Sequence, residues 1–108
     1  MDMTALQRML DAGRDSALLR FSLGKGLLDA GEPAEAAAHL QRCVAQDPTY
    51  SAGWKLLGKA WLAAGDADAA ARAWQEGIAV AQRNGDKQAE KEMAVFKRRV
   101  DKATAARG

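Results

Sequence analysis

Hydrophobic positions recur with helical spacing along the chain. Near the N-terminus, Leu6, Met9 and Leu10 form an i, i+3, i+4 stripe, and Gly13 follows as a stop signal. Near the C-terminus, one apolar stripe crosses an otherwise charged segment and consists of Ala89, Met93, Phe96, Val100 and Ala103. A single apolar stripe on a charged helix is typical of a capping helix, which covers the open end of a stack and shows charge to water.

Turn and cap signals divide the chain into about six helices. The expected helices span residues 2–12, 17–30, 33–46, 51–64, 67–83 and 87–106. Asp15 and Ser16 are candidate N-caps, Pro33 suits a first helical position, and Pro48 ends the third helix. Because much of the 48% apolar content is alanine, a strong helix former, we expect an all-α fold.

The central part of the chain repeats at an offset of 34 residues. Identical pairs at this offset include Leu23 and Leu57, Gly24 and Gly58, Lys25 and Lys59, Leu28 and Leu62, and Gly31 and Gly65. A period of this length predicts stacked helical hairpins, each of which needs its neighbours to bury its apolar face. Two repeats with a helix at each end should fold as one domain over residues 1–108.

The repeated residues resemble the tetratricopeptide repeat (TPR) family, in particular its small bacterial-type proteins. The family pattern is W-x2-L-G-x2-Y, then A-x3-F, then P. The second copy supplies Trp54, Leu57, Gly58, Trp61, Ala70 and Trp74, with Gln82 in place of the Pro. The first copy supplies Leu23, Gly24, Leu27, Ala36, Leu40 and Pro48, with Arg20 in place of the first Trp.

The resemblance covers Ala17 to Asn84 and implies a right-handed α-solenoid of antiparallel helix hairpins. The parts are an N-terminal helix (1–14), repeat 1 (17–50), repeat 2 (51–84) and a C-terminal capping helix (86–106). Glycine in mid-helix is less stable than alanine by about 1 kcal/mol. We therefore expect the paired helices to approach closely at Gly24 and Gly58, with Ala36 and Ala70 as small residues on the facing helices.

Catalytic groups are few. His39 and Cys43 share a helical face at i, i+4, but no third orienting group or oxyanion donor accompanies them. In the family register, Cys43 takes a small-residue position that packs against the next helix, and its counterpart is Gly77. The glycines are dispersed and form no phosphate loop, and one cysteine gives no paired metal ligands. We expect a protein without enzymatic activity, cofactor or metal.

The resemblance also implies a binding site on the concave surface, which the first helix of each hairpin lines. The implied inward positions are Leu18, Phe21, Lys25, Leu28 and Asp29 in the first repeat, and Ala52, Lys55, Lys59, Leu62 and Ala63 in the second. We expect a peptide segment of a partner protein, with acidic groups, to bind Phe21, Lys25, Leu28, Lys55, Lys59 and Leu62. Lys25 and Lys59 should stand one above the other with an anionic group between them.

One family subtype binds the C-terminal carboxylate of chaperone tails through a lysine, asparagine and arginine set. Phe21 and Leu56 stand at the first Lys and second Asn positions of that set, and Lys25 replaces the first Asn. Binding of chaperone tails is therefore not expected.

Two alternatives remain open. The first is self-assembly through the ends of the solenoid or the Met93, Phe96 and Val100 stripe, although we expect a monomer. The second is weak RNA binding through the basic C-terminal helix, where the cations are Lys97, Arg98, Arg99 and Lys102. The helix dipole alone favours cations at that end, and no aromatic residues interleave with them for base stacking. The net charge of +2 is also small for a nucleic-acid-binding protein.

Nothing in the sequence predicts association with a membrane. There is no uncharged apolar run of about 18 residues, and the start MDMTALQRML lacks the apolar core of a secretory signal. The single cysteine is consistent with a reducing compartment. We expect a cytoplasmic protein.

Overall fold

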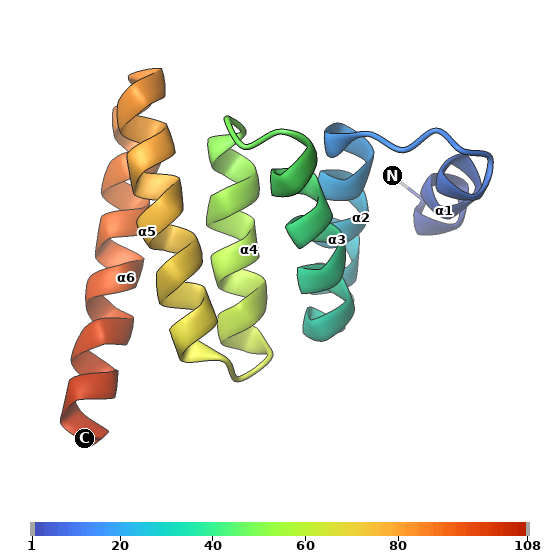
Figure 1. Cartoon of the computed structure of the whole chain (residues 1–108). Coiled ribbons are helices and arrows are strands. Elements are labelled where there is room, and N and C mark those ends of the chain that lie inside the picture. The colour runs from blue at the N-terminus through green and yellow to red at the C-terminus, as the bar shows by residue number, and fades with distance from the viewer. Residues whose placement is uncertain (1, 108) are drawn as a thin grey trace.

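The computed structural model describes residues 2–107, which contain six α-helices and no strand (Figure 1). The helices are α1 (Met3–Asp11), α2 (Ala17–Asp29), α3 (Pro33–Gln46), α4 (Ser51–Ala63), α5 (Ala67–Asn84) and α6 (Lys87–Arg107). Their ends lie within one residue of the expected ends, and the all-α fold is confirmed. Within the described residues, no helix has both the length and the apolar character needed to cross a membrane.

The helices from α2 to α6 form two layers of a curved stack. Consecutive helices contact each other, and α4 also touches both α2 and α6 (Figure 1). The helices α3 and α5 do not contact each other. Helices that touch on one side and separate on the other produce curvature, so α2, α4 and α6 form the concave inner layer. The outer layer consists of α3 and α5.

In each hairpin the two helices cross in close contact at a glycine, and we call these two contacts the glycine crossings. A Cβ atom at Gly24 would overlap the Leu40 side chain, and one at Gly58 would overlap the indole of Trp74. Both large side chains are fully buried. The Nε1 atom of Trp74 donates a hydrogen bond to the carbonyl oxygen of Lys55 at 3.1 Å, which satisfies the polar atom of this buried ring. The expected close approach is confirmed, and the contact at each glycine is with a large residue.

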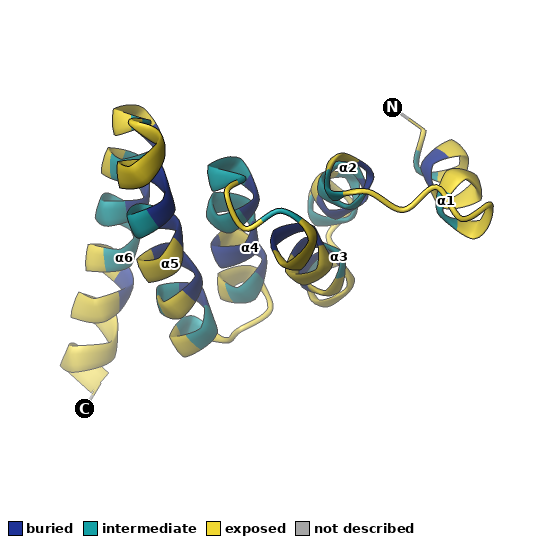
Figure 2. Ribbon diagram, turned by 45° about the horizontal axis from the view of Figure 1, so that its top comes forward, coloured by how far each residue is buried: buried dark blue, intermediate teal, exposed yellow. Residues whose placement is uncertain are grey.

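The apolar core runs through the stack as three clusters, which Figure 2 shows as buried faces between successive helices. The first joins Leu6 of α1 to Leu19 and Leu23 of α2. At the 34-residue offset, Leu19 and Leu23 correspond to Gly53 and Leu57. Gly53 and Leu57 belong to the buried face of α4 that packs against α3. Thus α1 covers α2 as an outer helix of a preceding hairpin would.

The C-terminal helix uses its apolar stripe within its own chain. Met93 and Val100 are buried in the cluster that α6 forms with α5. The ring of half-buried Phe96 lies 5.5 Å from that of Trp74, measured between centroids. The stripe thus packs mainly within the chain, and the fully buried Met93 cannot meet a second copy. The other route to self-assembly, through the ends of the solenoid, stays a prediction.

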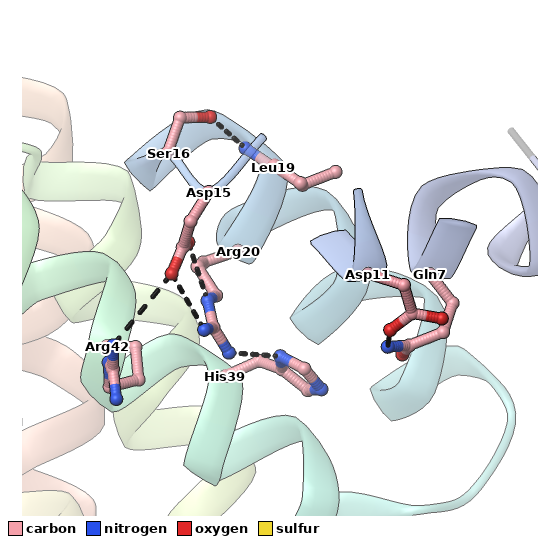
Figure 3. A network of polar contacts seen from close by, with 8 residues as sticks. All are labelled: Gln7, Asp11, Asp15, Ser16, Leu19, Arg20, His39 and Arg42. Atoms are coloured by element: carbon pink, nitrogen blue, oxygen red, sulfur yellow. Dashed lines mark hydrogen bonds and ion pairs between the residues drawn. The ribbon is translucent and has the colours of Figure 1, made fainter. Parts of the chain in front are cut away.

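A polar network replaces the missing tryptophan of the first repeat (Figure 3). The Nε and Nη2 atoms of Arg20 donate to the two carboxylate oxygens of Asp15, both at 2.8 Å. This bidentate bond holds the pKa of Asp15 well below its usual range and raises that of Arg20. The Nη1 atom of Arg20 donates to Nδ1 of His39 at 3.1 Å, while Arg42 lies 3.8 Å from Asp15. The network ties α2 to α3.

The glycine crossing predicts a steric difference between two alanine substitutions. Gly58→Ala should lower the free energy of unfolding by about 1–3 kcal/mol, because the buried Trp74 ring cannot move aside. Gly26→Ala meets only the flexible Met3 side chain and should be neutral or stabilising by up to about 1 kcal/mol. Urea unfolding measures both. Equal free energies of unfolding for the two variants would contradict the close contact between Gly58 and Trp74.

The network predicts a loss of stability in mild acid. Burial and the Arg20 charge lower the pKa of His39. The unfolded chain therefore takes up the proton first as the pH falls below about 6.5, and the free energy of unfolding declines there, by at most about 1.4 kcal/mol per pH unit. His39→Gln, which keeps a hydrogen-bond acceptor, should flatten this decline. Urea unfolding between about pH 7.5 and 5.5 tests it, and an equal slope in both proteins would refute it.

Candidate functional site

The six residues expected to bind a partner do not gather in one site, because three lie on α2 and three on α4. Phe21 and Lys25 line a small hollow of about 200 Å³ between α1 and α2. Lys59 and Leu62 line a hollow between α4 and α6. Leu28 is half-buried and packs against the central core cluster.

At the N-terminal end, the aromatic residue is already engaged within the chain. The Phe21 ring stacks on Tyr50 with 5.1 Å between centroids. Nζ of Lys25 lies 3.5 Å from an Asp29 carboxylate oxygen, and these side chains are 61% and 71% exposed. Such an exposed pair stabilises the fold little, so Lys25 remains accessible to a ligand.

Lys55 joins two helices of the inner layer. Its Nζ donates to the Glu92 carboxylate at 3.1 Å and so links α4 to α6. This hydrogen bond, with the Lys55 charge, holds the pKa of Glu92 below its usual value. Lys55 therefore has an intramolecular partner, which a binding role would have to displace.

Lys59 occupies a different environment from its repeat counterpart. Its Nζ lies 5.1 Å from the centroid of the Phe96 ring, within the range of a cation–π contact. Lys25 instead pairs with an acid on its own helix. The structure thus gives two lysines with separate partners, whereas the sequence pattern predicted an equivalent pair.

A cleft lies between α4 and the C-terminal half of α6; we call it the α4–α6 cleft. It consists of two adjoining hollows of about 250 and 240 Å³, which share Leu62, Arg99 and Val100. Trp74 and Phe96 line the first hollow; Ala103, Thr104 and Arg107 line the second. Leu62 is 44% exposed and lies between them.

Sequence reasoning placed Lys59 and Leu62 on the binding surface but missed the α6 side of the cleft. Phe96 and Val100 were assigned to the apolar stripe, and Arg99 to a basic group of four residues. That group spreads around α6, since Lys97 pairs with Asp101 at 2.6 Å whereas Arg99 faces the cleft. The spacing of Arg99 and Val100 at i+3 and i+4 from Phe96 was the available signal.

A larger hollow, of about 350 Å³, lies between α3, α4 and α5. Trp61 and Trp54 line it, and the Nε1 atom of Trp54 donates to the Pro48 carbonyl oxygen at 2.9 Å. Its charged side chains have both signs, with Arg72 opposed by Asp66 and Glu76. This outer hollow therefore shows no preference for the charge of a ligand.

His39 and Cys43 do not form a reactive pair. Burial raises the pKa of the Cys43 thiol to about 11, which keeps it protonated at neutral pH. Nδ1 of His39 accepts from Arg20. Cys43 instead packs close to Gly53 of the next helix, as its repeat position implied. Among residues 2–107, no group of three His, Cys, Asp or Glu side chains is placed to hold a metal ion.

Comparison with known proteins gives matches over most of the chain. The family pattern described as Tetratricopeptide repeat matches residues 27–91. TPR repeat-containing protein PA0015 of Pseudomonas aeruginosa is 65% identical over 98 residues, which cover 91% of this chain and 93% of that protein.

Two solved structures share the fold. The solution structure of protein BPP2914 from Bordetella parapertussis gives a TM-score of 0.83 at 42% identity, covering 98% of this chain and 92% of that one. The solution structure of a tetratricopeptide repeat domain protein from Salinibacter ruber gives a TM-score of 0.72 at 24% identity, covering 80% of this chain and 87% of that one. TPR domains generally mediate protein–protein interactions and are typically non-enzymatic. Together with the 34-residue repeat and the two glycine crossings, these matches show that the chain belongs to the tetratricopeptide repeat family.

Proposed function

We propose that the chain is an adapter that binds a peptide segment of a partner protein against its concave layer. The observation that carries this proposal is the exposure of large apolar side chains on the inner helices. Leu18 of α2 is 66% exposed and Leu62 of α4 is 44% exposed. They are two of the three large apolar residues exposed in residues 2–107. Apolar anchors of this kind carry much of the binding energy in protein interfaces.

The charges of the inner layer support a partner segment with acidic groups. Lys25 and Lys59 are exposed, and each lies on an inner helix. Complementary charges speed encounter and select among partners more than they add affinity. We further propose a cytoplasmic monomer, because the α6 stripe packs mainly within the chain and the free thiol of Cys43 is buried, out of reach of a second copy.

Charge reversal on each layer tests this function. We expect the Lys25→Glu, Lys59→Glu variant to lose a partner that the unmodified protein captures from a lysate of the producing cells. The matched control is Arg72→Glu, Arg83→Glu on the outer helix α5, which makes the same change in net charge and should retain the partner. Arg72 also lines the outer hollow.

Quantitative mass spectrometry measures the capture, and circular dichroism verifies that both variants are folded. The concave assignment fails if the outer variant alone loses the partner, or if neither variant does.

A further inference from the structure

We infer that the α4–α6 cleft binds an acidic segment that inserts a large apolar side chain. This inference rests on the proposed function, since it assigns a ligand chemistry to one part of the concave layer. Three features carry it, namely the apolar floor of the cleft, a lining that contains cations and no acid, and its open shape.

The floor of the cleft is apolar and already rigid. Val100 and Trp74 are buried and Phe96 is half-buried, so packing within the chain holds them in place. Leu62 remains exposed between the two hollows. Each hollow is smaller than the roughly 300–1,000 Å³ of sites for drug-sized molecules. Each hollow therefore has room for one inserted side chain.

The rim of the cleft is positively charged. Lys59, Arg99 and Arg107 line it, and no Asp or Glu is among the lining residues of either hollow. Acids elsewhere on α6 already have partners, because Glu92 pairs with Lys55, Asp101 pairs with Lys97, and Glu90 accepts a hydrogen bond from Gln82.

Arg99 is the cation best placed to select an acidic ligand. It lines both hollows, is exposed, and makes no ion pair with any residue from 2 to 107. A guanidinium group can bind a carboxylate through two parallel hydrogen bonds. A carboxylate next to an inserted apolar side chain would therefore find a partner here.

The open shape of the cleft allows a polypeptide to enter and leave. The C-terminal end of α6 extends beyond the turn between α4 and α5 (Figure 1). Residues 101–107 of this extension are exposed, and its Ala103 and Thr104 line the second hollow with Ala67. A segment anchored at Leu62 can thus continue along the extension.

A peptide selection tests the inference. A random peptide library, displayed on phage, is selected against the immobilised whole protein, and each enriched peptide is labelled for fluorescence anisotropy. We expect enriched sequences with Leu, Phe or Trp flanked by Asp or Glu. Their affinity should fall about tenfold or more in Arg99→Glu and in Leu62→Ser, and it should weaken with added salt.

Two exposed residues outside the cleft give matched controls. Arg98→Glu makes the same charge change one residue away, and Met9→Ser removes an exposed apolar side chain from α1, outside the concave layer; neither residue lines the cleft. Both should keep the affinity within about twofold. Urea unfolding of every variant confirms that the fold is retained.

The remaining outcomes separate this inference from the proposed function. Enriched peptides that are neutral or basic, or that bind Arg99→Glu and Leu62→Ser normally, overturn the cleft assignment but leave peptide binding intact. An equal loss in Arg98→Glu shows a general charge effect and also overturns it. A selection that enriches no peptide counts against both the cleft assignment and the proposed function.

Two other occupants of the cleft would also overturn the inference. One is a second copy of the chain, which light scattering would show if Arg99→Glu dissociates a dimer. The other is RNA, which labelled oligouridine would show by binding the cleft in place of peptides.

Discussion

The close contact between Gly58 and the Trp74 ring determines how the C-terminal half of the molecule is built. Without a side chain at Gly58, the indole lies directly against α4 and donates its hydrogen bond to the Lys55 carbonyl oxygen. Phe96 of α6 then packs against this ring, and Lys59 lies over Phe96. The same kind of contact recurs in the first hairpin, where Leu40 packs against Gly24. One steric constraint thus positions the floor of the α4–α6 cleft.

The inner helices α4 and α6 are linked more firmly at one end of the cleft than at the other. Near the start of the two helices, Lys55 bonds to Glu92, and one turn further Lys59 meets Phe96. At their C-terminal halves, Leu62 and Arg99 line a hollow, and no ion pair among residues 2–107 links the two helices there. The polar link fixes the spacing of the helices, and the open end leaves apolar surface and positive charge accessible. Because α4 and α6 are linked at one end of the cleft and open at the other, the protein can bind a segment without rearranging its own core.

The sequence carries enough information to predict the fold and the helix ends. The 34-residue offset, the cap residues and the mid-helix glycines are local signals, and each corresponds to a feature of the structure. The binding surface was less predictable, because Lys25 and Lys59 are identical by repeat but face different neighbours. At the repeat offset, Leu57 and Gly58 fall on Lys91 and Glu92, so α6 does not continue the motif. Its contacts with α4 depend on how the capping helix packs on α5, which no repeat position specifies.

The most direct measurement for the central claim, that the concave layer is the binding surface, is nuclear magnetic resonance mapping of the bound protein. Backbone and methyl signals of the labelled whole protein would be followed while an enriched peptide or the captured partner segment is added. The account predicts that the largest shifts cluster at Lys59, Leu62, Phe96, Arg99 and Val100. Shifts that cluster instead on the outer helices α3 and α5, around Gln41 and Arg72, would contradict it.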